Sequence, residues 1–307
     1  MTAAALPARL WTYQAERFPV FKHGLLILVF SGGEALYGAR LRGGGPDWPA
    51  VAVAAAVCFG LFLQLRIADE HKDFEDDSRW RPERPVQRGL IGLAELRVLA
   101  TLTAAVQVAA SALFHPPLLL VLLAVWGWMA LMTAEFFAPA WLKARPALYL
   151  VSHMLAMPLI ALFAVACGAR GLSVSIGWGL AAFLALAFLN GIVLEVARKT
   201  WAPADEREGV ETYSRLWGPR RAALVAAAAA GASALIATLA LQAVEGPAWA
   251  LAPVALGWAL LTGAALGYVR APVTGAAKRL ETAAGLFALL VYLGVAWLPI
   301  LAASWTR

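Results

Sequence analysis

Nine apolar stretches, each close to the length needed to cross a lipid bilayer, dominate this sequence. They cover residues 22–41, 49–67, 90–113, 117–137, 147–167, 173–195, 220–243, 248–269 and 281–303. An α-helix needs about 20 apolar residues to span the hydrocarbon core. Because unpaired backbone polar groups are too costly in lipid, such segments fold as helices. The sequence therefore predicts an all-α integral membrane protein, with nine transmembrane helices in a single domain over residues 1–307.

The composition agrees with a membrane location. Hydrophobic residues make up 62% of the chain and charged residues only 14%, whereas soluble domains have about 25% charged residues. The formal net charge of +6 would suggest a nucleic-acid partner in a soluble protein, but in a membrane protein it reflects cationic cytoplasmic loops. We therefore expect a lipid bilayer as the surroundings and no nucleic-acid partner.

The distribution of lysine and arginine predicts the orientation of the chain. With the N-terminus in the cytoplasm, 21 of the 25 basic residues lie on the cytoplasmic side and 4 on the other side. This bias is the usual signal for orientation, and it favours a multi-pass protein of the bacterial inner membrane. Both long polar segments, residues 66–89 and 195–219, then lie on the cytoplasmic face, after the second and sixth spans.

The first polar segment contains three regularly spaced aspartates. Asp69, Asp73 and Asp77 stand at positions i, i+4 and i+8, which places three carboxylates on one face of a helix. Such carboxylates repel one another unless a positive charge lies between them. Oxygen ligands with room for phosphate oxygens are typical of Mg²⁺ sites, so we interpret the segment as a Mg²⁺ site. The simpler alternative is a solvated charged loop between two spans.

The second polar segment begins with a short charged motif at the end of the sixth span. Glu195, Arg198 and Lys199 share one helix face, whereas Asn190 lies well round the helix from Glu195. Glu195 and Lys199 could form an ordinary helix salt bridge. Beside a pyrophosphate group, they could instead supply a metal ligand and a cation. Within the spans, Glu34, Glu135 and His153 are candidates for a functional role, because polar groups inside a membrane are costly; the alternative is a purely structural contact.

These motifs together resemble those of the UbiA superfamily of intramembrane prenyltransferases, which has nine transmembrane helices. Asp69-Glu70-x-x-Asp73-x-x-x-Asp77 fits the aspartate-rich motif that follows the second helix in that family. Arg84-Pro85-x-x-x-Gly89 is similar to its Arg-Pro-x-x-x-Gly motif, and Gly209-x-x-Thr212 with Gly218 is similar to the end of its second motif. Pro139-x-x-x-Lys143 resembles a further segment of the family but lacks its tyrosine.

The resemblance implies a Mg²⁺-dependent enzyme that ionises an allylic isoprenyl diphosphate. The implied catalytic and metal-binding residues are Asp69, Asp73, Asp77 and Glu195. The implied diphosphate-binding residues are Lys72, Arg84, Arg88, Lys143, Asn190, Arg198 and Lys199. The isoprenoid tail would lie among the apolar helices, where small residues such as the run 226–231 leave space.

One departure from the family pattern leaves alternatives open. The second motif usually carries two aspartates four residues apart, whereas this chain has Glu195 and Lys199. Either the Lys199 ammonium replaces a metal ion, or Asp205 is the working acid. The expected reaction is transfer of the prenyl group to an aromatic or other lipophilic acceptor. The alternatives are a terpene cyclase of the same fold, which needs no acceptor, and a transporter, which the position of the charges at one face disfavours.

Overall fold

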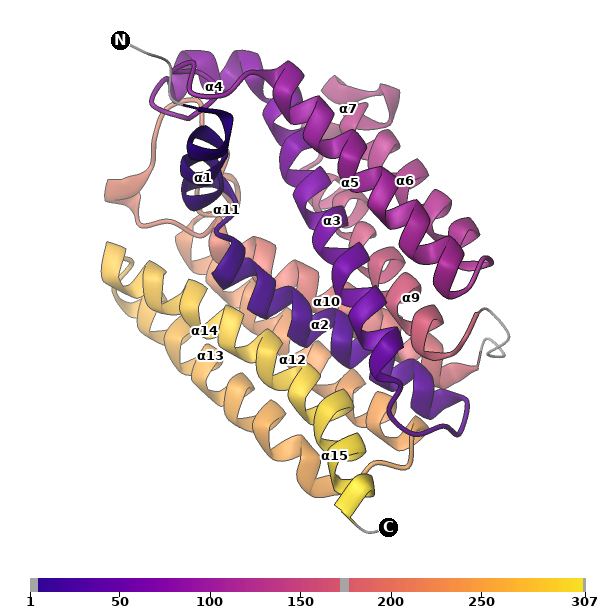
Figure 1. The fold of residues 1–307 in the computed structure, drawn as a ribbon. Helices are drawn as coiled ribbons and strands as arrows, with labels where there is room; N and C mark the ends of the chain where they lie inside the picture. Colours follow the sequence, from indigo (N-terminus) through magenta and orange to yellow (C-terminus); the bar gives the residue numbers. More distant parts are fainter. Residues whose placement is uncertain (1–4, 172–176, 306–307) are drawn as a thin grey trace.

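The apolar stretches form a bundle of α-helices in the computed structural model, which describes residues 5–171 and 177–305 (Figure 1). Eight helical segments in this part of the chain are long and apolar enough to cross a membrane. They are Val20–Leu41 (α2), Trp48–Lys72 (α3), Leu93–Phe114 (α5), Pro146–Gly168 (α8, Pro146–Met154, and α9, Ala156–Gly168), Trp178–Arg198 (α10), Pro219–Ala243 (α12), Ala248–Arg270 (η3, Ala248–Leu251, and α13, Ala252–Arg270) and Thr274–Leu301 (α14, Thr274–Tyr292, η4, Leu293–Trp297, and part of α15, Leu298–Trp305).

The remaining predicted span forms a shorter helix. Residues 117–137 contain α6, Leu118–Thr133, which has 16 residues and is followed by the 3₁₀ turn η1, Glu135–Phe137. A helix of that length is too short to cross the bilayer core. The described residues therefore contain eight helices of bilayer length, and α6 is not among them, whereas nine were predicted. The start of the predicted sixth span, residues 173–176, lies outside the described part of the chain.

One membrane segment is interrupted at a proline. In the span Pro146–Gly168, α8 ends at Met154 and α9 begins at Ala156. Pro158 has no N–H to donate to the carbonyl of Met154, and its ring collides with that carbonyl in a regular helix. The break therefore follows from the local sequence.

Small residues allow close contact between helices. A Cβ on Gly168 would lie 1.7 Å from the carbonyl oxygen of Ala35, so α9 and α2 touch backbone to backbone. Ala226 and Ala230 of α12 are fully buried in the cluster that α12 forms with α10. Ala226 and Ala230 therefore offer no space for an isoprenoid tail, whereas Ala228 in the same run is exposed, so that expectation stays a prediction for the rest of the run.

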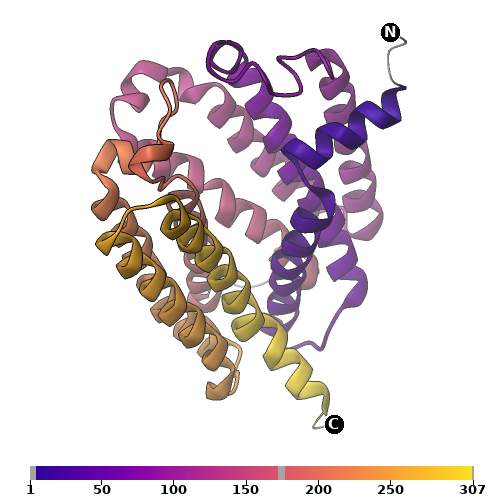
Figure 2. The ribbon, with the colours of Figure 1, turned by 90° about the vertical axis from the view of Figure 1, so that its left-hand side faces the viewer.

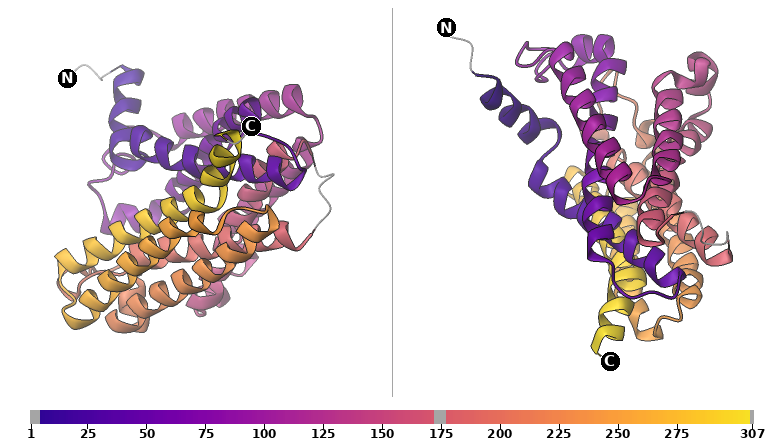
Figure 3. Two further views of the ribbon diagram at one scale, coloured as in Figure 1. Left: turned by 90° about the horizontal axis from the view of Figure 1, so that it is seen from below. Right: turned by 45° about the vertical axis from the view of Figure 1, so that its right-hand side comes forward.

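The short helices gather at one end of the bundle. Figures 1 and 2 show α1 (Leu6–Arg17), α4 (Phe74–Trp80) and α11 (Tyr213–Trp217) at the end opposite the C-terminal helix α15. Figure 3 shows the chain between α2 and α3 on the C-terminal side of the molecule. The polar segments that follow α3 and α10 thus lie at the same end of the bundle, as their positions after two parallel spans require.

Candidate active site at the polar end of the bundle

The aspartates of the first polar segment keep helical spacing across a break. Helix α3 ends at Lys72 and α4 begins at Phe74, so Asp73 is the junction between them. The backbone N–H of Asp73 donates to the carbonyl of Asp69 (2.9 Å), and the N–H of Asp77 donates to the carbonyl of Asp73 (2.8 Å). The four-residue register that the sequence predicts is therefore preserved in the backbone.

The three side chains have different surroundings. The Asp69 side chain is 49% exposed and lies 3.7 Å from Arg66. Asp77 is buried, and it accepts hydrogen bonds from Arg81 (2.7 Å) and from Arg84. Within the described residues, no three side chains of the His, Cys, Asp and Glu type are arranged to hold a metal ion. Two arginines thus neutralise Asp77, and its role as a Mg²⁺ ligand stays a prediction.

Asp73 lies where the two polar segments meet. Burial and the nearby Asp69 carboxylate raise the pKa of Asp73, while the ammonium groups of Lys72 and Lys199 act in the opposite direction. Lys199 belongs to the second polar segment, so the fold brings both segments to one place. A carboxylate pair that is partly buried and mutually repelling fits a divalent cation, which is commonly held by one or two carboxylates together with substrate phosphates. Asp69 and Asp73 are that pair.

Lys72 binds two residues, Glu135 and Tyr149, that lie far from it in the sequence. Its Nζ donates to Glu135 Oε1 (2.9 Å) and to the hydroxyl of Tyr149 (2.7 Å), and that hydroxyl donates to Glu135 Oε1 (3.2 Å). The ring of Tyr149 stacks on His153 with centroids 3.9 Å apart. The predicted diphosphate ligand Lys72 and the two intramembrane candidates Glu135 and His153 are therefore members of one cluster.

The segment that carries Glu135 has a strained backbone. Glu135, Phe136 and Phe137 have φ values of 48°, 51° and 59°. A residue with a Cβ pays roughly 1–2 kcal/mol in this left-handed region. Such strain persists only where the surroundings impose it, and it is frequent at functional sites. The ion pair with Lys72 fixes Glu135, whose Oε2 is buried without a hydrogen-bond partner in the described structure.

Glu195 is enclosed by the cations of its own helix. Its carboxylate lies 2.5 Å from Arg198 and 2.9 Å from Lys199, and its side chain is 16% exposed. The helix salt bridge that the sequence left open is thus present. Arg198 is half-exposed, and Lys199 also points toward the aromatic ring of Tyr213, 5.9 Å from its centroid. A polyanion could take over these two cations from Glu195.

Hydroxyl groups of the second polar segment form hydrogen bonds within that segment. Thr212 and Ser214 both donate to Glu206 (2.7 and 2.6 Å), and Ser214 accepts from the backbone N–H of Trp201 (2.8 Å). Asp205 closes the turn η2, Pro203–Asp205, and has no ion pair in the described structure. Its side chain is therefore still available for the alternative in which Asp205 is the working acid.

Gly209 is the point where the two polar segments touch. Its φ is +70°, and a Cβ there would lie about 2.4 Å from the ring of Trp80 on α4. We expect Gly209→Ala to lower the thermal unfolding midpoint in detergent, by the equivalent of about 2 kcal/mol, because the new Cβ is strained and overlaps a ring. Gly267→Ala is the control: Gly267 lies within α13 with open space around it, so alanine should raise the midpoint slightly. A Gly209→Ala protein as stable as the wild type would contradict this contact.

A pocket lies between α7 (Pro139–Lys143), α8 and the second segment. Its lining includes Lys143, Tyr149, Lys199, Thr212 and Tyr213. Its two ammonium groups and two tyrosine hydroxyls suit an anion with several oxygens. The exposed Glu211 carboxylate also lines the pocket, and Thr212 already donates to Glu206. Sequence reasoning missed Tyr149 and Tyr213; the only local signal was that Tyr149 stands one helical turn before His153.

The other predicted diphosphate ligands are engaged elsewhere. Arg84 binds Asp77, and Arg88 binds Glu16 of α1 at 2.7 Å and donates to the carbonyl of Glu83. Arg17 of α1 binds the fully buried Glu70 at 2.6 Å. These pairs fasten α1 and the loop after α4 to the end of α3. Arg84 and Arg88 therefore have structural partners in addition to any contact with substrate.

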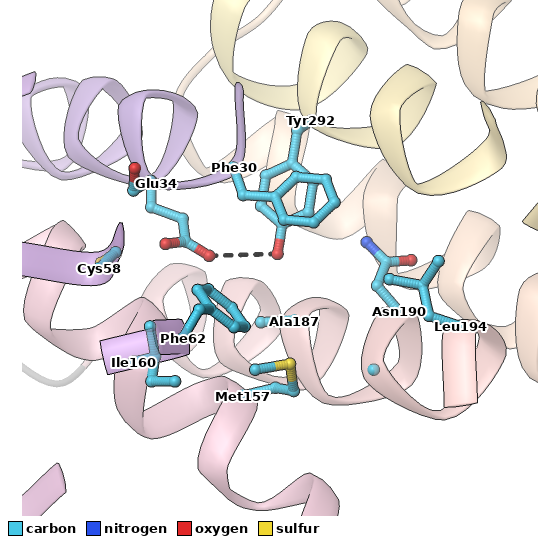
Figure 4. Close-up of a pocket in the computed structure, with 12 residues that line it drawn as sticks. Phe30, Glu34, Cys58, Phe62, Met157, Ile160, Ala187, Asn190, Leu194 and Tyr292 are labelled. Atoms are coloured by element: carbon cyan, nitrogen blue, oxygen red, sulfur yellow. Dashed lines mark hydrogen bonds between the residues drawn. The ribbon is translucent and has the colours of Figure 1, made fainter. Parts of the chain in front are cut away.

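Asn190 lies deeper in the bundle than Glu195. It lines an internal cavity together with Glu34 and Tyr292, and its Oδ1 accepts a hydrogen bond from Ser233 at 2.8 Å (Figure 4). Glu34 is buried and accepts a hydrogen bond from the hydroxyl of Tyr292 at 3.2 Å. The structure therefore separates Asn190 from the pocket of Lys143 and Lys199, with which the sequence had grouped it.

Comparisons with known proteins show a family and a fold that this chain shares with them. The model of the UbiA prenyltransferase family matches residues 29–290. The chain belongs to this family. The apo structure of a UbiA homolog from Aeropyrum pernix K1 is similar over 87% of this chain and 96% of the other, with a TM-score of 0.64 and 18% sequence identity. A structure of digeranylgeranylglyceryl phosphate synthase is similar over 95% of this chain and 100% of the other, with a TM-score of 0.61 and 17% identity. No curated protein matches the sequence.

Family membership confirms the resemblance drawn from the motifs. At such low identity, the two similar structures establish the fold alone. The UbiA-type fold accounts for the membrane bundle. Membership of the UbiA prenyltransferase family supports an intramembrane prenyltransferase-type activity as the general function of this chain.

Proposed function

We propose that this UbiA-family protein is a Mg²⁺-dependent prenyltransferase that transfers the prenyl group of an allylic isoprenyl diphosphate to an aromatic or other lipophilic acceptor. The observation that carries the proposal is the contact between the two polar segments, where Gly209 lies against the ring of Trp80. The Lys199 ammonium also acts on the Asp73 carboxylate there. In this proposal Asp69 and Asp73 hold the metal, and the nearby pocket supplies two lysines, Lys143 and Lys199, for a diphosphate.

The residues of the pocket have distinct roles in this proposal. Lys143 and Lys199 bind the diphosphate, and the hydroxyl of Tyr213 donates a hydrogen bond to its oxygens. The hydroxyl of Tyr149 does so once it turns away from Glu135. Asp69 and Asp73 hold Mg²⁺, which when bound neutralises charge on the diphosphate. Asp77 and Glu195 bind metal in this proposal only if the diphosphate takes over the arginine and lysine side chains that pair with them. Lys199 replaces the charge of a second metal ion where the family carries a carboxylate.

The reaction depends on stabilising the leaving group. The C–O bond of the allylic diphosphate breaks, its electron pair leaves with the diphosphate, and a carbocation remains on the prenyl chain. Cations that are fixed around the developing negative charge lower the barrier to this step. The acceptor then forms a bond to the carbocation and loses a proton. Both partners are lipophilic and reach the site from the bilayer, on the side that the charge bias predicts to be cytoplasmic.

Cyclisation without an acceptor is the second candidate, and the Lys199 substitution favours it because this position departs from the common transferases. One experiment separates the two. Purified protein is incubated with Mg²⁺ and geranyl, farnesyl or geranylgeranyl diphosphate, first alone and then with phenolic and lipid acceptors. We expect diphosphate release and a prenylated product only when an acceptor is present.

Each other outcome of this experiment has a definite meaning. Cyclic hydrocarbons without an acceptor would establish the cyclase. Release of no diphosphate under any condition, from a protein that elutes as a folded species in detergent, would refute the proposed donor chemistry.

A further inference from the structure

A mostly apolar cavity lies inside the membrane bundle, below the diphosphate pocket. Helices α2, α3, α9, α10 and α14 surround it, and Phe30, Phe62, Met157, Ile160 and Leu194 form much of its wall. Besides Ser31, whose hydroxyl donates to the carbonyl of Ile27, three polar side chains reach it: Glu34 from α2, Asn190 from α10 and Tyr292 from α14 (Figure 4). We refer to these three residues as the polar stop.

The three residues of the polar stop form only some of the hydrogen bonds that their side chains can make. The hydroxyl of Tyr292 donates to Glu34, and Ser233 donates to Asn190 Oδ1. The Nδ2 of Asn190 is buried and faces the hydroxyl of Tyr292 without a hydrogen bond of good geometry. No cation in the described part of the chain pairs with Glu34. Asn190 is 2% exposed and Glu34 5%. Unpaired polar groups at this depth destabilise a membrane protein, which favours a functional role for them.

The cavity lies on the path that a prenyl tail would follow. Leu194, in its wall, directly precedes Glu195 at the polar end, and Asn190 stands one and a half turns deeper, at about 7 Å along the helix axis. Cys58, near Glu34, lies eleven residues before Asp69 on α3, at about 16 Å along that axis. A tail whose diphosphate rests beside Lys199 would therefore run from the apolar wall toward the polar stop.

We propose that the polar stop restricts the enzyme to short-chain prenyl diphosphates; this inference rests on the proposed function. A short tail ends against the apolar wall, whereas a longer tail must cover Glu34, Asn190 and Tyr292 with hydrocarbon. The carboxyl group needs hydrogen-bond partners in either protonation state, and so does the Asn190 amide. Hydrocarbon supplies none, and each group left without a partner costs affinity by roughly tenfold.

The test compares donors of increasing length. The kcat/KM for diphosphate release and the affinity for the donor would be measured with geranyl, farnesyl, geranylgeranyl and longer polyprenyl diphosphates. We expect the wild type to discriminate at least tenfold against the longer donors. Glu34→Leu and Asn190→Leu should each raise the ratio of long-donor to short-donor activity by about tenfold.

Two control variants separate polarity from shape and from general effects. Glu34→Gln keeps a polar group of similar size and should keep the wild-type ratio. Gln107→Leu removes another buried polar group within the membrane, one that donates to the carbonyl of Val57 outside the cavity, and should also leave the ratio unchanged.

The outcomes separate this inference from the proposed function. Equal use of short and long donors by the wild type, or an unchanged ratio in a folded Glu34→Leu protein, would overturn the polar stop and leave the prenyl chemistry intact. If Glu34→Leu does not fold, the ratio of long-donor to short-donor activity in Asn190→Leu, a variant of α10, decides instead. A wild type that neither binds nor turns over any donor would refute the proposed function, and the polar stop with it.

Discussion

We expect Asp73→Ala to lower turnover of a prenyl diphosphate by at least about a hundredfold, because loss of one group that supports charge stabilisation typically costs roughly 10²–10³ in rate. Asp73 lies at the junction of α3 and α4 and is the acid on which Asp69, Lys72 and Lys199 act together. Its carboxylate has no ion pair in the described structure, so its removal should leave the fold intact. Diphosphate release at saturating Mg²⁺ measures the effect.

The matched control for this variant is Asp76→Ala. Asp76 is a neighbouring acid on α4, and it is exposed. Its removal changes the net charge equally without touching the pocket, so turnover should stay within about twofold of the wild type, as is usual for surface substitutions. A folded Asp73→Ala protein with unchanged turnover and an unchanged Mg²⁺ requirement would remove Asp73 from the metal site.

For Asp77→Ala we expect the opposite pattern, a large loss of stability. The side chain of Asp77 is 2% exposed, and it neutralises Arg81 and Arg84, which are about one-fifth exposed. Removal of one partner from such a buried pair leaves unpaired charge and typically costs about 3–5 kcal/mol. Because the two arginines are partly exposed, we expect the loss of stability to lie near the lower end of this range. The thermal unfolding midpoint in detergent should fall well below that of Asp73→Ala.

The same pair of measurements decides what Asp77 does. If Asp77→Ala is as stable as the wild type but inactive, Asp77 acts in catalysis or metal binding, as the sequence motif implies. If it is unstable and Asp77→Asn recovers part of both stability and activity, its main role is to hold the loop after α4 through Arg81 and Arg84. Asp76→Ala again serves as the control for net charge.

Local patterns were sufficient to predict much of this protein. The length of the apolar stretches requires membrane helices whatever their neighbours are, because the bilayer sets the requirement. The spacing of Asp69, Asp73 and Asp77 predicts their common backbone register, since that register depends only on hydrogen bonds along one segment. The motifs also identified the family. The ninth predicted span, residues 117–137, is not confirmed: an apolar helix is present there, but it stops at Thr133 and a left-handed turn follows.

The tertiary structure decided which polar side chains are paired with other residues and which are unpaired. Spacing alone could not show that Asp77 and Glu195 are neutralised, that Glu135 pairs with Lys72, or that Asn190 belongs to a cavity with Glu34. Composition alone also could not show that, within the run 226–231, Ala226 and Ala230 are buried while Ala228 is exposed. Burial and charge pairing depend on which side chains other helices present at each position, and that arrangement arises only when the whole bundle is packed. The sequence by itself therefore determined the membrane fold and the family, whereas the packed bundle decided which acids, lysines and tyrosines face the site.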